Sequence, residues 1–140
     1  MMLTTKGRYA VIAVLDIATN SSEKPVSISD IAARQNIAQN YLEQIFMKLR
    51  AKDIVTAKRG SKGGYALARD SSDIMIGEIV ESVGESIKIT KCSDKLGCQK
   101  EGVKCSTHDL WFGLASAIKL YLSSISINDV ISGNIRENIF

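Results

Sequence analysis

The most constraining feature of this chain is an apolar stripe within residues 39–52. Its members recur at i, i+3, i+4 and i+7, the spacing that places side chains on one face of an α-helix. They are Leu42, Ile45, Phe46 and Leu49. We therefore expect a helix from about Gln39 to Lys52 that buries this face and shows a polar face to solvent.

Two further helices are predicted before it. Residues 5–19 form the first, which ends before a polar stretch closed by Pro25, the single proline. The second begins near Ser29, the expected N-cap, and the chain then turns at residues 34–36. The expected apolar faces are Tyr9, Ile12, Leu15 and Ala18 in the first helix, and Ile28, Ile31 and Ala32 in the second.

Two short helices joined by a turn of about four residues match a helix-turn-helix. The major groove of DNA admits one α-helix, and amide or carboxylate side chains near its start can pair with base edges. Any small helical bundle also has a solvated polar face, so this segment alone leaves a purely structural bundle open.

A basic, glycine-rich loop follows, between β-prone runs at residues 54–58 and 65–68. Its sequence is Arg59-Gly60-Ser61-Lys62-Gly63-Gly64. Glycine permits the positive φ values of a tight hairpin and a close approach of backbone to a partner. This order of elements is typical of a winged helix, whose wing contacts phosphates or the minor groove. A phosphate-binding P-loop is excluded, because the G-x-x-x-x-G-K-[ST] order is absent and no helix follows directly.

Charge is distributed unevenly over the 140 residues. The formal net charge is +3, but residues 1–70 hold 11 Lys/Arg against 6 Asp/Glu, and residues 71–140 hold 7 against 9. If the protein binds a polyanion, we therefore expect it to bind to the first half of the chain. With 45% hydrophobic and 24% charged residues the chain is too apolar to be disordered. No apolar run approaches the roughly 18 residues of a membrane span and no signal-peptide region is present, so we expect a cytoplasmic protein.

All soft metal ligands of the chain lie within residues 92–108. They are Cys92, Cys98, Cys105 and His108, in the pattern C-x5-C-x6-C-x2-H. An odd number of cysteines in a cytoplasmic chain disfavours a disulfide framework. The loop has few apolar residues, so a bound metal would organise it. Three thiolates and an imidazole suit a tetrahedral zinc ion and equally suit the irons of a small iron–sulfur cluster.

Spacing and charge favour the larger group. Zinc sites usually use tight C-x2-4-C pairs, and here five and six residues separate the consecutive cysteines. Nearby lysines would balance an anionic cluster and lower the pKa of the thiols; they are Lys88, Lys91, Lys95, Lys100 and Lys104. Inert thiols are disfavoured, because free cysteine is usually buried. An enzyme with Cys105 as nucleophile and His108 as base is disfavoured, because no oxyanion donor is evident.

Helices are also expected in the second half, over residues 73–84, after His108, and over residues 127–131 behind the cap Ser126. The helix after His108 carries the longest apolar stripe, which a partner copy or its own domain must cover. We expect the first helix to cover it in cis and a partner's helix in trans. The candidate dimer interface is Leu110, Leu114, Ala117, Ile118, Tyr121, Leu122 and Ile125.

Four motifs together resemble the IscR-type iron–sulfur cluster regulators, a family of winged helix-turn-helix transcription factors. They are Leu3-Thr4-Thr5-Lys6-Gly7-Arg8-Tyr9-Ala10, Tyr41-Leu42-Glu43-Gln44, the wing Arg59-Gly60-x-x-Gly63-Gly64-Tyr65, and the cysteine-rich loop followed by Trp111. The likeness covers residues 1–133. The gap between the second and third cysteines is one residue longer than in the family pattern.

The resemblance implies a dimeric regulator, mostly α-helical with a small β-hairpin wing, that controls and represses cluster-assembly genes. It implies a [2Fe–2S] cluster on Cys92, Cys98, Cys105 and His108, delivered by cluster-assembly proteins, whose presence changes which promoters are bound. The residue matching Glu43 screens promoter classes in such regulators. The alternative keeps the winged helix and replaces the cluster by structural zinc or by thiols that sense oxidants or nitric oxide.

We divide the chain into a DNA-binding domain (1–70), a connecting helix (71–90), a cluster-binding loop (91–108), and a dimerisation helix with a short C-terminal helix (109–140). Cations supply phosphate attraction, and Glu43 can accept from a cytosine N4 donor. The candidate DNA-contacting residues are Lys6, Arg8, Asn40, Tyr41, Glu43, Gln44, Lys48, Lys58, Arg59, Ser61, Lys62 and Gly63.

Overall fold

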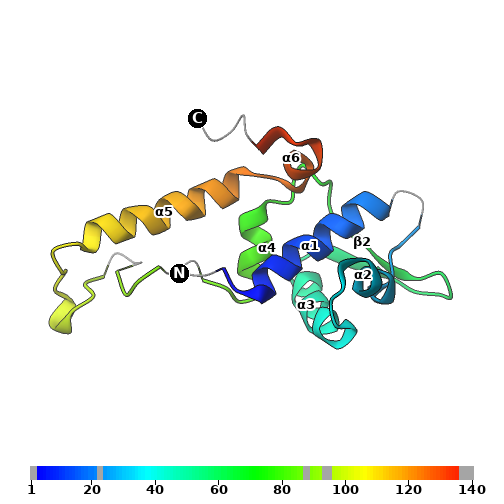
Figure 1. Cartoon of the computed structure of the whole chain (residues 1–140), viewed down its shortest axis with the longest axis horizontal. Helices are drawn as coiled ribbons and strands as arrows, with labels where there is room; N and C mark the ends of the chain where they lie inside the picture. The colour runs from blue at the N-terminus through cyan, green and yellow to red at the C-terminus, as the bar shows by residue number, and fades with distance from the viewer. Residues whose placement is uncertain (1–2, 22–23, 87–88, 93–95, 136–140) are drawn as a thin grey trace.

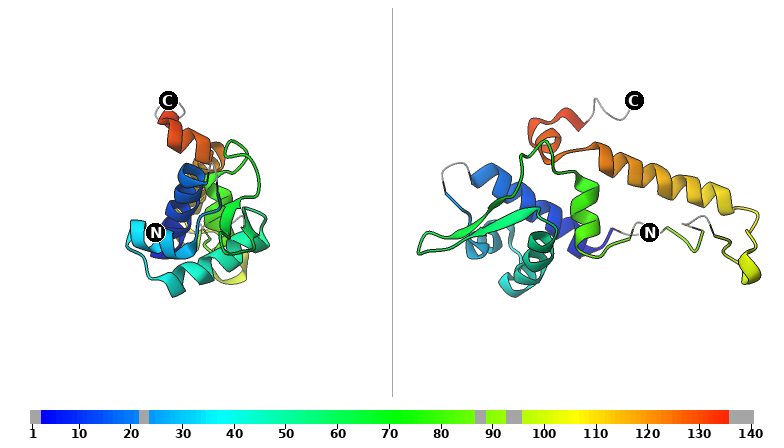
Figure 2. Two further views of the ribbon diagram at one scale, coloured as in Figure 1. Left: turned by 90° about the vertical axis from the view of Figure 1, so that its right-hand side faces the viewer. Right: turned by 180° about the vertical axis from the view of Figure 1, so that it is seen from behind.

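The computed structural model describes residues 3–21, 24–86, 89–92 and 96–135. The elements in chain order are α1 (Thr5–Asn20), α2 (Ile28–Gln35), α3 (Gln39–Ala51), β1 (Val55–Lys58), β2 (Gly64–Leu67), α4 (Ile76–Ser82), the 3-10 turn η1 (Lys100–Gly102), α5 (His108–Ser124) and α6 (Ile127–Ser132). Helices α1 to α4 and α6 surround one core, and α5 projects away from it (Figure 1), as the view from behind confirms (Figure 2). The predicted fold class, mostly helical with a β-hairpin, is confirmed.

Helix α3 has the apolar face that its sequence predicts. Leu42, Ile45, Phe46 and Leu49 are all fully buried. The helix ends at Ala51, with Lys52 at its C-cap. Its polar face therefore points outward, as a recognition helix requires.

Helix α1 buries a different face from the predicted one. The predicted residues Tyr9, Ile12, Leu15 and Ala18 are only half-buried, whereas Ala10, Ala13, Val14 and Ile17 are fully buried. Residues 9–15 are all apolar, so spacing alone does not select a face. Helices α2, α3, α4 and α6 all contact α1, and its small alanines allow this close packing.

The N-cap of helix α2 lies two residues earlier than predicted. Ser27, not Ser29, is the N-cap, and its hydroxyl accepts a hydrogen bond from the Asp30 amide at 3.1 Å. The helix ends at Gln35, and its C-cap Asn36 adopts the left-handed conformation with φ 54° that asparagine tolerates. Of its predicted apolar face Ile31 is fully buried, and the other two residues are half-buried against the core.

A buried carboxylate joins α1 to α2. Asp16 is 4% exposed. Its oxygens accept two hydrogen bonds from the Arg34 guanidinium, at 2.7 and 3.0 Å, and one from the Gln35 amide at 2.8 Å. Burial alone would raise the pKa of Asp16, but the hydrogen bonds from Arg34 and Gln35 and the charge of Arg34 lower it overall. This network fixes the first helix of the helix-turn-helix onto α1.

The hairpin is antiparallel and is fixed against α3. Val55 pairs with Leu67 and Lys58 with Gly64. Near its turn the Tyr65 and Val26 backbones exchange two hydrogen bonds of 2.7 and 2.8 Å. The Tyr65 ring lies 4.6 Å from that of Phe46, which belongs to α3. The wing and the recognition helix therefore form one unit.

The second half departs from prediction at two points. Helix α4, rather than α1, is the main neighbour of α5 among the described residues. Ile125, predicted in the dimer interface, lies beyond the end of α5 and is 3% exposed, so it belongs to the core of its own chain. Its carbonyl accepts a hydrogen bond from the Ile76 amide at 2.8 Å.

The start of α6 follows the prediction. Ser126 and Asp129 form a reciprocal capping box. The helix ends at Ser132, before Gly133 in the left-handed conformation. Within the part of the chain that the structure describes, no helix is both long and apolar enough to cross a membrane.

Candidate nucleic-acid interface and metal site

The candidate DNA-contacting residues form an outward surface on α1, α3 and the wing. Lys6, Tyr41 and Gly63 are half-buried. The exposed ones are Arg8, Asn40, Glu43, Gln44, Lys48, Lys58, Arg59, Ser61 and Lys62. This surface carries both hydrogen-bonding groups and cations, the two kinds of contact that a nucleic acid requires.

A groove lies beside the start of α3. Ala38 occupies the N-cap and has no side-chain oxygen to cap the helix, and the Asn40 side chain instead accepts a hydrogen bond from the Tyr41 amide at 3.0 Å. Tyr41 packs edge-on against Tyr9, with ring centroids 5.8 Å apart. The groove is lined by Thr5, Tyr9, Asn36, Ile37, Ala38, Asn40, Tyr41 and Gln44. An anion at this edge would meet the positive end of the helix dipole.

Two lysines meet where α1, α3 and α4 converge. The pKa of Lys6 is lowered, mainly because the Lys48 side chain lies beside it and secondly because of burial, while the Glu85 carboxylate opposes the shift. Lys48, on α3, also donates to the Val83 carbonyl at 3.5 Å. Two adjacent ammonium groups repel each other, and a phosphate between them would relieve that repulsion.

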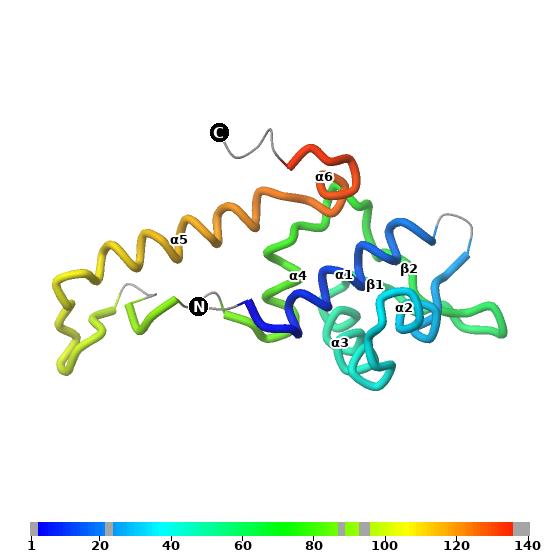
Figure 3. Tube along the Cα trace, in the orientation of Figure 1, coloured from blue at the N-terminus to red at the C-terminus, as the bar shows by residue number. Residues whose placement is uncertain are grey.

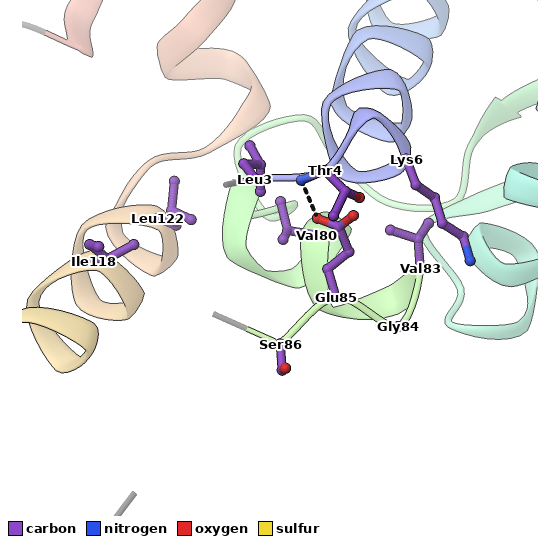
Figure 4. A pocket seen from close by; sticks show the side chains of 10 residues that line it. All are labelled: Leu3, Thr4, Lys6, Val80, Val83, Gly84, Glu85, Ser86, Ile118 and Leu122. Carbon is purple, nitrogen blue, oxygen red and sulfur yellow. Dashed lines mark hydrogen bonds between the residues drawn. The ribbon is translucent and has the colours of Figure 1, made fainter. Parts of the chain in front are cut away.

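Glu85 caps α1 from the end of α4. Its carboxylate accepts hydrogen bonds from the Thr4 amide at 3.3 Å and from the Gly7 amide at 3.2 Å. A side chain at Gly7 would overlap this carboxylate. Figure 4 shows Glu85 at the edge of a cavity of about 490 Å³ between α1, α4 and α5. Sequence reasoning missed this contact, because the partners are about 80 residues apart and no local pattern connects them.

The three cysteines come together at the outer end of α5. The Sγ atoms of Cys92, Cys98 and Cys105 all lie within 4.8 Å of one another. Those of Cys92 and Cys105 are 3.5 Å apart, and the Cys105 amide donates to Cys98 Sγ at 3.4 Å. Figure 3 follows the trace from α4 through this segment and back into α5. The predicted gathering of thiols is confirmed.

His108 is adjacent to this group but outside it. It is the first residue of α5 and is 1% exposed, with its ring parallel to that of Phe112. Its amide donates to the Cys105 carbonyl at 3.1 Å. This hydrogen bond holds the first turn of α5 next to the third cysteine. The imidazole nitrogens of His108 are not among the ligand atoms that lie within 4.8 Å of one another.

The contacts among the three thiols shift the pKa values of Cys92 and Cys105 in opposite directions. Hydrogen bonds from Cys98, Cys92 and Thr107 lower the pKa of Cys105 to about 7. A hydrogen bond with Cys98, then burial and the Cys105 thiol, raise the pKa of Cys92 to about 11. Among the residues that the structure describes, no lysine contributes to either shift. Lys88 and Lys95 lie outside the described residues, and Lys104 pairs with Asp109 at 3.1 Å. A metal bound here would displace the remaining thiol protons.

Helix α5 has an inner and an outer apolar face. The inner face holds Ala115, which is buried, and Ile118 and Leu122, which are half-buried and line the cavity of Figure 4. The outer face is exposed and holds Leu110, Leu114, Ala117, Tyr121 and, unforeseen in the sequence, Leu120, which is 73% exposed.

Residues 3–133 match the family model described as "Rrf2: Iron-dependent Transcriptional regulator". The chain belongs to the Rrf2 family. It is 46% identical over 139 residues to the HTH-type transcriptional regulator IscR of Photobacterium profundum, a match that covers 99% of this chain and 80% of that protein. It is also 46% identical over 132 residues to IscR of Escherichia coli O1:K1, covering 94% of this chain and 81% of the relative.

Two solved structures have the same fold as this chain. CymR, the global cysteine regulator of B. subtilis, superposes with a TM-score of 0.81 at 29% identity, covering 94% of this chain and 97% of that one. T. potens IscR superposes with a TM-score of 0.78 at 31% identity, covering 100% and 93%. The predicted resemblance is confirmed, and this Rrf2 protein is a winged-helix transcriptional regulator that binds DNA.

Proposed function

We propose that this regulator senses iron–sulfur cluster status through a [2Fe–2S] cluster held by Cys92, Cys98, Cys105 and His108. The observation that carries the proposal is the convergence of three thiol sulfurs within 4.8 Å, next to the single histidine. When bound, such a cluster would supply a redox-active crosslink of residues 92–108. The proposed targets are promoters of cluster-assembly genes, and cluster-assembly proteins are the proposed donors.

The donor set fits a soft metal centre. Sulfurs around one tetrahedral zinc ion lie about 3.8 Å apart, given Zn–S bonds of about 2.3 Å, and a two-iron cluster needs two ligands on each iron. The three sulfurs can supply one iron fully and half of the other. His108, three residues after Cys105, is the remaining soft ligand and completes the set of four.

The second candidate function is a zinc-stabilised or cluster-free thiol sensor. It is favoured by the compactness of the three sulfurs and by the pKa of Cys105 near 7, which gives a reactive thiolate at neutral pH.

For DNA recognition we propose that α3 enters the major groove and the wing contacts the backbone. Glu43 and Gln44 are exposed on α3 and can reach base edges, with Glu43 accepting from cytosine. Lys58, Arg59 and Lys62 on the wing supply phosphate attraction. The paired Lys6 and Lys48 are the proposed phosphate clamp between α1 and α3.

We propose that a second copy covers the outer face of α5. Leu110, Leu114, Ala117 and Tyr121 share this face, and leaving it in water would be unfavourable. A two-fold dimer also pairs two recognition helices, which matches a palindromic operator. Three residues of the interface predicted from the sequence are not part of this proposal: Ile118 and Leu122 line the cavity on the inner face, and Ile125 is buried in its own chain.

The coupling between the two sites runs through the end of α4. Val83 contacts α3 through Lys48, and Glu85 holds the start of α1. The chain then continues from Glu85 to Cys92 in seven residues. Ordering of the cysteine segment would therefore act on both DNA-facing helices, provided that the ligand binds the two states with different affinity.

Purification without oxygen tests the metal assignment. The proposal predicts a red-brown protein that contains equal amounts of iron and sulfide. Cys92→Ala should lose both, whereas Ser106→Ala in the same loop should keep them. A colourless protein with one zinc per chain would support the second candidate function instead.

A further inference from the structure

Met47 is an exposed apolar residue in the middle of the polar face of α3. It is 73% exposed, although its neighbour Phe46 is fully buried. The only other exposed large apolar residue among the described residues up to 70 is Leu3. Leu3 lines the cavity with Ile118 and Leu122, so the fold already uses it (Figure 4). Packing within the chain leaves the Met47 side chain in water.

The helical geometry places Met47 on the same side as the polar groups. At 100° per residue, it lies about 20° from Asn40, about 40° from Glu43 and about 60° from Gln44 around the helix axis. All four side chains are exposed. This face of α3 therefore has three hydrogen-bonding side chains and one apolar side chain. A binding partner complementary to it would place an apolar group opposite Met47.

The major groove offers one apolar feature on its base edges, which is the C5-methyl group of thymine. The methionine side chain is unbranched and polarisable, so it can adjust to such a methyl group without a fixed shape. Contact between the Met47 side chain and this methyl group would remove apolar surface of both from water, which is favourable.

We propose that Met47 is a specificity-determining residue that contacts a thymine methyl group in each half-site. This inference rests on the proposed entry of α3 into the major groove. It adds to the hydrogen-bonding residues an apolar preference for thymine next to the bases that Glu43 and Gln44 face. It also assigns an exposed residue that was absent from the candidate DNA contacts.

The test removes one methyl group at a time from the DNA. Duplexes are first selected from a random library by the full-length protein, and each thymine of the selected site is then replaced by uracil, which lacks only the C5-methyl. Replacement of the thymine that contacts Met47 in one half-site should weaken binding about fourfold, the value of one buried methyl group. Met47→Ala should bind this duplex and its thymine parent equally well.

Ile131→Ala is the control, because Ile131 is also an exposed apolar residue but lies on α6, outside the proposed DNA contacts and the proposed dimer interface. It should keep the full sensitivity to uracil. Two results would overturn the role of Met47 and leave the placement of α3 intact. One is a selected sequence in which no thymine-to-uracil replacement weakens binding, and the other is equal sensitivity to uracil in Met47→Ala and the wild type. Failure to enrich any duplex would overturn the placement of α3 in the groove and this inference with it.

Discussion

Replacement of Asp16 by Asn is expected to lower the free energy of unfolding by about 2 kcal/mol. Asp16 accepts hydrogen bonds from Arg34 at 2.7 and 3.0 Å and from Gln35 at 2.8 Å, with 1% of its side chain exposed. An asparagine amide turned to keep its oxygen toward Gln35 points its NH₂ group at the other Arg34 donor. One charge-assisted bond, worth about 1.5–3 kcal/mol, is then lost.

We expect the loss of free energy to lie in the lower part of that range, because Arg34 is partly exposed. Its side chain is 41% exposed, so water replaces part of the lost contact. For a chain of this size about 2 kcal/mol corresponds to a fall in Tm of about 8 °C. Urea unfolding followed by circular dichroism at pH 7 measures the change. In a double-mutant cycle, Arg34→Ala should add little to Asp16→Asn, because both remove the same contact.

The pH dependence gives a second check of the same interaction. The pKa of Asp16 is lowered in the folded state, so its contribution is present above the unfolded pKa of about 3.9 and is lost as the pH falls through the folded value. The difference between the wild type and Asp16→Asn should therefore shrink below about pH 4. Asp73→Asn, at an exposed position, is the control. Equal free energies of unfolding for Asp16→Asn and Asp73→Asn at pH 7 would contradict the proposed role of the Asp16–Arg34 contact.

Four further changes test the two DNA-facing elements and the junction with α4. Gly64→Ala should displace the wing, because its Cβ would lie 2.5 Å from the Val26 carbonyl oxygen, and should cost at least about 2 kcal/mol in urea unfolding. Glu85→Gln should lower stability by about 1 kcal/mol through loss of the charged cap of α1. Arg59→Ala should weaken binding to every duplex and reduce the salt slope by about one. Glu43→Ala should change the ranking of duplexes and leave the salt slope unchanged.

Gly64→Ala, Glu85→Gln and Arg59→Ala each have a control in the same chain. Gly113→Ala adds a methyl group in open space and should be neutral or stabilising. Glu81 and Lys119 form an exposed ion pair at 3.5 Å, so Glu81→Gln and Lys119→Ala should each change stability by less than about 1 kcal/mol. Lys119→Ala should also keep the wild-type salt slope. A loss of binding in Lys119→Ala equal to that in Arg59→Ala would show that the wing has no special role.

Sequence patterns predicted the parts of this protein that depend on local spacing. The stripe of α3 is regular and flanked by polar residues, so its buried face followed directly. Residues 9–15 of α1 are apolar without interruption, and which side is buried depends on the helices around it. Ile125 continues the spacing of α5, but the chain leaves the helix at Ser124. A periodic pattern cannot show such a bend.

The candidate sites divide in the same way. The cysteines are close in sequence, so their convergence could be predicted from their spacing. The contact between Asp16 and Arg34 joins two helices, and the contact between Glu85 and Gly7 joins the two ends of the core. These pairings are set by tertiary packing, which a single sequence does not reveal. Met47 gave no signal because an exposed apolar residue is recognised only once the fold is known.

The most direct test of the central claim is the affinity of one preparation for a panel of promoter duplexes, measured at fixed salt with the iron–sulfur cluster present and after its removal. The account predicts that the order of preference among the duplexes changes between the two forms. It also predicts that Cys92→Ala behaves like the cluster-free form throughout. Identical affinities for every duplex in both forms would contradict the claim that residues 92–108 control DNA recognition.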